Sequence, residues 1–259
     1  MTDALQTLDV DSPQGKIGIA VRVRTGRSPA IVWLGGFMSD MTSTKAAALD
    51  RWAEETGHAS VRFDYSGHGI SGGRFEEGTI GGWLDQSLQV IERFAGPAPV
   101  LVGSSMGGWI ALLATLRLAA RQSTHAPSGL VLIAPAVDFT ERLMWAQFSD
   151  AIRDDIMTKG VWHRPSQYSD TPYPITRALI EDGRAHLLFG KPFTTGCPVH
   201  ILQGGQDPDV PQAHALKLVE HLPHDTVRVT LIPDGDHRLA RDEDIAKLVA
   251  ITAAMATGT

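Results

Sequence analysis

The stretch APVLVGSSMGGWIALLA, residues 98–114, places two adjacent serines and three glycines between a short apolar run and a long one. The run PVLVG has the length and branched side chains of a buried strand, whereas MGGWIALLATLRLAA has the length and composition of a helix. A serine between such a strand and helix lies on a tight turn at the carboxyl edge of a parallel sheet. Ser105 occupies that turn, and Gly103 and Gly107 remove side chains that would collide across it.

Strand and helix patterns alternate along the rest of the chain. Repeated alternation indicates a mostly parallel, doubly wound α/β sheet, because right-handed crossovers place helices on both of its faces. The residues of the first two expected strands suit an antiparallel edge that leads into a central strand. The expected strands are residues 16–23, 30–36, 59–65, 99–103, 129–137, 198–205 and 227–233, and the expected helices are residues 45–57, 79–96, 106–120, 211–222 and 241–256.

The length and composition of the chain limit the class of protein to which it can belong. A chain of 259 residues is typical of one large α/β domain, so we expect residues 1–259 to form a single domain. The formal net charge of −6 gives no attraction to nucleic acid, and no apolar run approaches the roughly 18 residues of a membrane span. A lone Cys197 excludes an internal disulfide, and the opening MTDALQTLDVDS lacks the basic and apolar regions of an export signal. We therefore expect a cytoplasmic protein.

One segment, residues 140–196, interrupts the alternation. It spans 57 residues between two core strands and carries seven of the chain's 17 aromatic residues. We interpret it as a short helical lid inserted into the sheet domain. Most of its rings are expected to pack the insertion against the body, and a few could line an apolar pocket.

The pattern Gly-x-Ser-x-Gly occurs twice, so its context must select the reactive serine. Ser71 lies in the glycine-rich stretch SGHGISGGRFEEG, without a strand directly before it or a helix directly after it. Ser105 has both. A helix N-cap role would explain one serine at this position but not the paired glycines. The context therefore predicts Ser105 as a nucleophile, with the positive end of the helix dipole directed at negative charge that forms beside it.

A serine hydroxyl needs a base, and the chain has ten histidines. Only His237 lies in a loop directly after the last expected strand, at the sheet edge that also carries Ser105. Asp207, in the loop after the preceding strand, is the carboxylate expected to orient the imidazole, with Asp209 as its neighbour. The order Ser, Asp, His is the one that this type of fold requires. His214, on a helix, is expected on a solvated face.

Two backbone N–H groups are expected to bind the transition-state oxyanion. Met106, directly after the nucleophile, supplies the first. The second comes from the loop after the strand at residues 30–36, where Phe37 is the leading candidate and Met38 the alternative. Gly35 and Gly36 would let that loop approach Ser105 closely, although the requirements of a simple turn would explain either glycine alone.

These features together resemble the α/β-hydrolase family over nearly the whole chain. A more specific resemblance is to abhydrolase-domain enzymes whose mitochondrial members are acyl-protein thioesterases and acyl-glucuronide esterases. The family assigns Ser105, Asp207 and His237 as the triad and implies that residues 64–66 help to shape the site, where tight-turn chemistry is an alternative explanation. The mitochondrial members carry a targeting extension that this sequence does not show, so we expect a bacterial cytoplasmic relative or a processed form. The resemblance is carried by the stretches FDYSGHGISGGRFEEGTIGGW, GSSMGGW, MTKGVWHRPSQYSD and DHRLARDEDI.

The sequence thus predicts a serine hydrolase that cleaves ester or thioester bonds of small-molecule or acyl-protein substrates. Neither a metal nor an organic cofactor is expected, because the chemistry needs none and no Cys/His cluster has zinc spacing. Two alternatives stay open. The same triad could transfer the acyl group to another acceptor or make peracids, and the scaffold could serve a non-catalytic ligand-binding protein.

Overall fold

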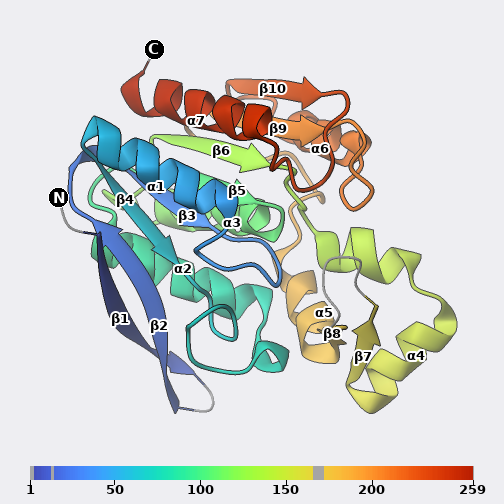
Figure 1. Cartoon of the computed structure of the whole chain (residues 1–259). Coiled ribbons are helices and arrows are strands. Elements are labelled where there is room, and N and C mark those ends of the chain that lie inside the picture. The colour runs from blue at the N-terminus through green and yellow to red at the C-terminus, as the bar shows by residue number, and fades with distance from the viewer. Residues whose placement is uncertain (1–2, 13–14, 166–171, 259) are drawn as a thin grey trace.

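A central β-sheet organises the chain, which the computed structural model describes over residues 3–12, 15–165 and 172–258 (Figure 1). The sheet contains β1 (Asp3–Ser12), β2 (Gly15–Arg24), β3 (Arg27–Leu34), β4 (His58–Phe63), β5 (Val100–Ser104), β6 (Gly129–Ile133), β9 (Val199–Gly204) and β10 (Val227–Ile232). Within the described residues the strand order is β1-β2-β4-β3-β5-β6-β9-β10. The pairs β1–β2 and β2–β4 are antiparallel, and the other pairs are parallel. The expected mostly parallel sheet with an antiparallel edge is confirmed.

Helices cover both faces of this sheet, as a doubly wound fold requires. The helices are α1 (Thr44–Thr56), α2 (Ile80–Phe94), α3 (Met106–Ala120), α6 (Gln212–Glu220) and α7 (Asp242–Thr257). Helices α1 and α7 lie together over one face, in the foreground of Figure 1, and α2 and α3 lie over the other. Each face has its own apolar core, with α2, α3 and α6 contributing to the larger one and α1 and α7 to the smaller.

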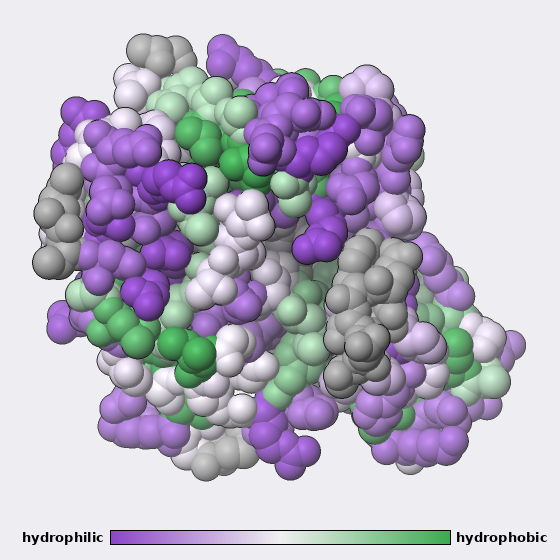
Figure 2. Space-filling view, in the orientation of Figure 1, coloured by the Kyte–Doolittle hydropathy of each residue, from purple (hydrophilic) through white to green (hydrophobic). Residues whose placement is uncertain are grey.

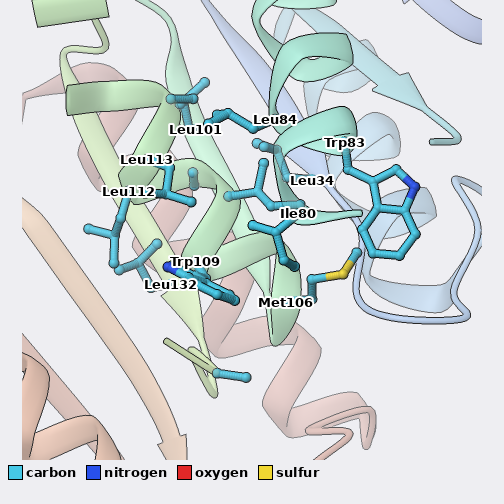
Figure 3. Close-up of a cluster of buried hydrophobic side chains, with 14 of the residues drawn as sticks. Leu34, Ile80, Trp83, Leu84, Leu101, Met106, Trp109, Leu112, Leu113 and Leu132 are labelled. Atoms are coloured by element: carbon cyan, nitrogen blue, oxygen red, sulfur yellow. The ribbon is translucent and has the colours of Figure 1, made fainter. Parts of the chain in front are cut away.

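The larger core fixes the start of α3, which directly follows Ser105. Met106 and Trp109 are buried in the first turns of α3 and belong to the same cluster as Ile80 and Trp83 of α2. Figure 3 shows Met106 directed towards these α2 side chains. Close packing of large side chains in a core resists displacement. The turn that carries Ser105 is therefore held by the core behind it.

The segment between β6 and β9 forms the insertion at the right of Figure 1. It contains α4 (Asp150–Lys159), β7 (Val161–Arg164), β8 (Tyr173–Thr176) and α5 (Arg177–Gly183). The helices agree with the expected helical segment, but the antiparallel pair β7–β8 was not anticipated. Strands of four residues are too short to show a reliable alternation of apolar and polar positions. Tyr168 and the end of the stretch MTKGVWHRPSQYSD lie outside the described residues.

Asp138 joins the two ends of this insertion. Its carboxylate is fully buried and accepts hydrogen bonds from the backbone N–H groups of Leu188, at 2.7 Å, and Phe189, at 2.9 Å. The guanidinium of Arg142 donates a further bond at 3.3 Å. Hydrogen bonds to a buried carboxylate are strong because the charge cannot be solvated by water. The insertion is thus anchored next to the strand from which it leaves the sheet.

Strand β1 was also missed by the sequence analysis. It pairs with β2 along its whole length, from Asp3 opposite Arg24 to Ser12 opposite Gly15. Only Val10 of this strand is buried, so the alternation that identifies a half-buried strand is absent.

Hydrophilic side chains cover most of the face seen in Figure 2, and its apolar residues form small, separate groups. Among the described helices, none combines the length and apolar character needed to cross a membrane.

Candidate active site

Ser105 lies between β5 and α3 in a strained backbone conformation. Its φ of 54° and ψ of −117° fall in a region that residues other than glycine rarely adopt. Three backbone hydrogen bonds hold it there. Its N–H donates to the carbonyl of Ile133 at 2.8 Å, and its carbonyl accepts from Gly108 at 2.9 Å and Ala136 at 3.1 Å. The surrounding structure therefore imposes the strain, as at a nucleophile elbow.

The glycines around this serine are required by close backbone contacts. A Cβ at Gly103 would collide with the carbonyl of Gly107, and a Cβ at Gly107 would collide with the carbonyls of Leu34 and Gly35. The first turn of α3 therefore packs directly on the end of β3. This contact brings the loop after β3 beside Ser105, since a Cβ added to Gly36 would lie 3.5 Å from the Cβ of Ser105.

The structure brings Ser105, His237 and Asp207 together from three separate loops. His237 Nε2 lies 3.1 Å from Ser105 Oγ, and His237 Nδ1 lies 2.8 Å from Asp207 Oδ2. These distances correspond to hydrogen bonds along one continuous chain of side chains. The arrangement allows the imidazole to accept the serine proton on one nitrogen while the carboxylate holds the other.

Asp207 is held by its own loop, and its side chain has no exposed surface. Its Oδ1 accepts hydrogen bonds from the backbone N–H groups of Asp209, at 2.9 Å, and Val210, at 2.8 Å. Gln203 Nε2 is 3.4 Å from Oδ2, the oxygen that also faces His237. The carboxylate is therefore preorganised as an acceptor towards the imidazole.

Asp207, Asp209 and His237 also form a group whose potential metal-ligating atoms lie within 4.8 Å of one another. The two oxygens of Asp207 are already engaged with His237 and with backbone N–H groups. Metal-binding histidines usually ligate through one nitrogen and give the other to a hydrogen-bond acceptor. Here His237 Nε2 faces the hydroxyl of Ser105 instead, so this donor set fits a proton relay better than a metal centre.

Hydrogen bonds in the loop after β3 distinguish between Phe37 and Met38, the two candidates for the second oxyanion donor. The N–H of Met38 donates to His68 Nε2 at 3.3 Å, which commits it to a side chain of the protein. No hydrogen bond involves the N–H of Phe37 within the described part of the chain. Met106 is the first residue of α3, where the N–H has no partner inside the helix. The geometry thus favours Phe37 and Met106 over Met38 as the donor pair.

Sequence reasoning missed His68, which lies in the DYSGHG segment and supports this loop. Its Nδ1 is 3.1 Å from the carbonyl of Ser66, and burial lowers the pKa of the imidazole to about 4, against the raising effect of that carbonyl. A neutral ring with its proton on Nδ1 can accept the Met38 hydrogen bond on Nε2. Asp64 accepts a second loop bond, from Met41 N–H at 2.6 Å, and burial raises the pKa of this carboxyl.

Two cavities meet at Ser105 and His237. One, of about 170 Å³, has a mainly apolar wall formed by Phe37 and Met106, by residues of and next to the insertion, and by the loop that follows Asp207. The other, of about 460 Å³, has a wall of mixed polar and apolar surface formed by residues 36–40 and 42–45, by Trp33, Ser104 and Tyr173, and by the loop after His237. A largely apolar cavity beside polar groups that converge on one point is the usual form of a small-molecule site.

Two other sequence interpretations have clear outcomes. Ser71 is a loop residue as expected, and its Oγ donates to the Asp64 carbonyl at 2.6 Å and accepts from Ala20 N–H at 2.8 Å. The expectation for His214 is wrong, because its ring is buried and its Nε2 lies 2.7 Å from the Val137 carbonyl. A histidine on a helix suits either face, and only the packing of α6 against the sheet decides which.

A mostly parallel sheet with a strained serine between a strand and a helix defines a class of protein, and this chain belongs to it: the α/β hydrolase family, whose sequence profile matches residues 29–251. The chain is 34% identical over 232 residues to Homo sapiens palmitoyl-protein thioesterase ABHD10, mitochondrial. That match covers 89% of this chain and 74% of the human protein.

Solved structures extend the comparison. A putative hydrolase from Agrobacterium vitis S4 is similar, with a TM-score of 0.96 and 47% identity over 99% of this chain and 100% of that one. Alpha/beta hydrolase domain-containing protein 10 from mouse has a TM-score of 0.85 and 30% identity over 97% of this chain and 98% of that one. The family and these relatives support a hydrolase activity for the chain.

Proposed function

We propose that the protein is a serine hydrolase of acyl esters or thioesters. The single observation that carries the proposal is the hydrogen-bonded chain from Asp207 through His237 to Ser105, which ends at a strained serine between two cavities. The name of the ABHD10 relatives supports the inclusion of thioesters among the substrates. The substrate would be a small molecule or an acylated protein.

The first half of the reaction transfers the acyl group to the enzyme. Ser105 Oγ attacks the carbonyl carbon while His237 Nε2 accepts the hydroxyl proton, and the N–H groups of Phe37 and Met106 bind the oxyanion. Collapse of the tetrahedral intermediate breaks the carbon–oxygen or carbon–sulfur bond, and His237 returns the proton to the leaving alcohol or thiol. Asp207 stays ionised and stabilises the transient imidazolium.

Water completes the cycle. It gives a proton to His237 as its oxygen attacks the acyl-enzyme, and the same two N–H groups bind the second oxyanion. Collapse of this intermediate releases the carboxylic acid and returns the proton to Ser105 Oγ. His237 therefore accepts and returns the proton in both halves of the reaction.

The apolar cavity is the proposed acyl site. Its volume of about 170 Å³ lies below the roughly 300–1,000 Å³ of pockets for drug-sized ligands, so we propose acyl groups of several carbons as the best substrates. Leu143, Met144 and Tyr173 bring the insertion into its wall. This placement supports a lid role for residues 140–196, because movement of the insertion would change the size of the cavity.

The test uses p-nitrophenyl esters and acyl thioesters of increasing chain length, together with a fluorophosphonate probe for the serine. Ser105→Ala should lose covalent labelling and reduce kcat/KM by at least a thousandfold. Ser71→Ala is the matched control, because it removes the serine of the other Gly-x-Ser-x-Gly pattern and should still be labelled. Full hydrolysis and labelling in folded Ser105→Ala would rule out the proposed nucleophile.

A further inference from the structure

Strand β10 forms an open edge of the central sheet. It pairs with β9 and, within the part of the chain that the structure describes, with no other strand (Figure 1). The carbonyls of Thr226 and Ile232, at the two ends of β10, accept hydrogen bonds from the β9 side. Because the direction of the backbone groups alternates along a strand, the N–H and C=O groups of Val227, Val229 and Leu231 point outward. These groups are available to a further strand.

The same three residues form an apolar row on one face of β10. Val227 packs against the larger core, to which α6 contributes, whereas Ile232 belongs to the smaller core beside α7. Alternation along the strand therefore places Val227, Val229 and Leu231 together on the face that α6 covers. Val229 and Leu231 are each 40% exposed, so the row reaches solvent at the edge of the sheet.

Helix α6 extends this apolar row. His214 Nε2 lies 2.7 Å from the carbonyl of Val137, which follows β6, so this side of the helix faces β6. At about 100° per residue, Leu216 and Val219 lie on the opposite flank of α6, towards β10. Leu216 is 44% exposed, and Val219 is half-buried against the larger core. Together these side chains form the β10 patch, which consists of Leu216, Val219, Val227, Val229 and Leu231.

The two edges of the sheet differ in charge. Strand β1, at the other edge, carries Asp3, Asp9 and Asp11. Charged side chains on an edge strand oppose pairing with another chain. Strand β10 carries one charged residue, Arg228, whose side chain lies on the face opposite the apolar row. The β10 edge therefore lacks the charges that protect the β1 edge.

We propose that the β10 patch binds a second copy of this chain, with the two β10 strands antiparallel about a twofold axis at Val229. In this register Val229 lies opposite the partner's Val229, and Val227 lies opposite the partner's Leu231. Each of these residues exchanges both of its backbone hydrogen bonds with the opposite residue, because its N–H and C=O groups point outward. The paired stretch ends before Pro233, which has no N–H to donate.

The self-complementary arrangement of side chains favours a second copy over another partner. The apolar row meets the same row of the partner, as a twofold interface requires. On the other face Arg228 lies opposite the partner's Thr230, so no like charges face each other directly. The two Arg228 side chains lie diagonally across the axis, where they are long enough to extend into solvent. This interface does not depend on the reaction proposed at Ser105.

Sedimentation velocity of the unaltered chain between about 1 and 100 µM tests the proposal. We expect the mass to rise towards twice the 27.9 kDa of one chain, because small interfaces associate weakly. Val229→Glu places two carboxylates opposite each other at the axis and should weaken dimerisation by about tenfold or more. Leu5→Glu, at a 52% exposed position on β1, is the matched control and should dimerise as the unaltered chain does. Urea denaturation of both variants checks that they are folded.

A mixture of Val229→Glu and Val229→Lys chains tests the register. Each variant alone should stay monomeric, whereas the mixture should regain the dimer because opposite charges then meet at the axis. Mixing would not repair a folding defect in either variant. An unaltered chain that stays monomeric at about 100 µM leaves this edge to another protein or to a peptide strand, and overturns the proposal. A dimer that survives Val229→Glu, or a mixture of the two folded variants that stays monomeric, also overturns it.

Discussion

Replacing Asp207 by Asn tests the proton relay with little change in shape. Asp207 Oδ1 accepts two backbone hydrogen bonds, and the Asn carbonyl oxygen can keep both by occupying the same place. The Asn NH2 group then faces His237 Nδ1, where Oδ2 of the carboxylate now lies at 2.8 Å. A donor at that point forces Nδ1 to accept and places the ring proton on Nε2, towards Ser105. The imidazole can then no longer take the serine proton.

The expected effect is large on catalysis and small on folding. The wrong tautomer and the lost carboxylate charge should reduce kcat/KM by about 10³–10⁴-fold, which corresponds to about 4–5.5 kcal/mol in the barrier. The unfolding free energy should fall by less than about 2 kcal/mol, because the two backbone bonds persist. The NH2 group of Gln203, at 3.4 Å from Oδ2, contributes to that loss by facing a second donor.

The assay is hydrolysis of p-nitrophenyl butyrate, with urea denaturation to measure stability. The matched control is Asp11→Asn on the exposed edge strand β1, which should change neither quantity measurably. Folded Asp207→Asn that keeps activity within tenfold of the unaltered chain would refute the reasoning, since the base would then work without its carboxylate.

Two further predictions concern the framework of the site. Gly107→Ala should lower the unfolding free energy measured by urea denaturation by about 1–3 kcal/mol, because the added Cβ would collide with the carbonyls of Leu34 and Gly35. The control is Gly190→Ala, where no atom lies within 4 Å of the added Cβ. This variant should lower the unfolding free energy by less than about 0.5 kcal/mol. His68 has a pKa of about 4 in the folded chain against 6.5 in a free histidine, so below pH 6.5 the unfolded chain binds a proton that the folded chain does not. Stability should therefore fall by up to about 3 kcal/mol more in the unaltered chain than in His68→Gln as the pH drops from 7 to 4. Equal pH profiles for these two proteins, or equal stabilities for the two glycine variants, would contradict the respective argument.

Local sequence signals placed most of the framework correctly. The strand before Ser105 and the helix after it are each read from a continuous run of residues, and the glycines mark the turn between them. The positions of Asp207 and His237 follow from the fold, because parallel strands deliver the loops at their carboxyl ends to the same edge of the sheet. Where almost no side chain is buried, as along β1, or where the strands have only four residues, as in the pair β7–β8, the periodicity is lost and the sequence does not predict the strands.

The sequence by itself determined the order of the sheet strands after β1 and of the five helices that cover the sheet, the turn at Ser105 and the three loops from which a proton relay could be built. Only the tertiary structure decided that Met38 is committed to His68 while Phe37 is not, that His214 faces inward, and that two cavities, one of them mainly apolar, meet at the serine. The physical reason is the range of the interactions. Hydrophobic periodicity and turn chemistry act within a few residues, whereas the hydrogen bonds and cavity walls of the site join residues that are distant in the chain and meet only when the sheet and its helices pack.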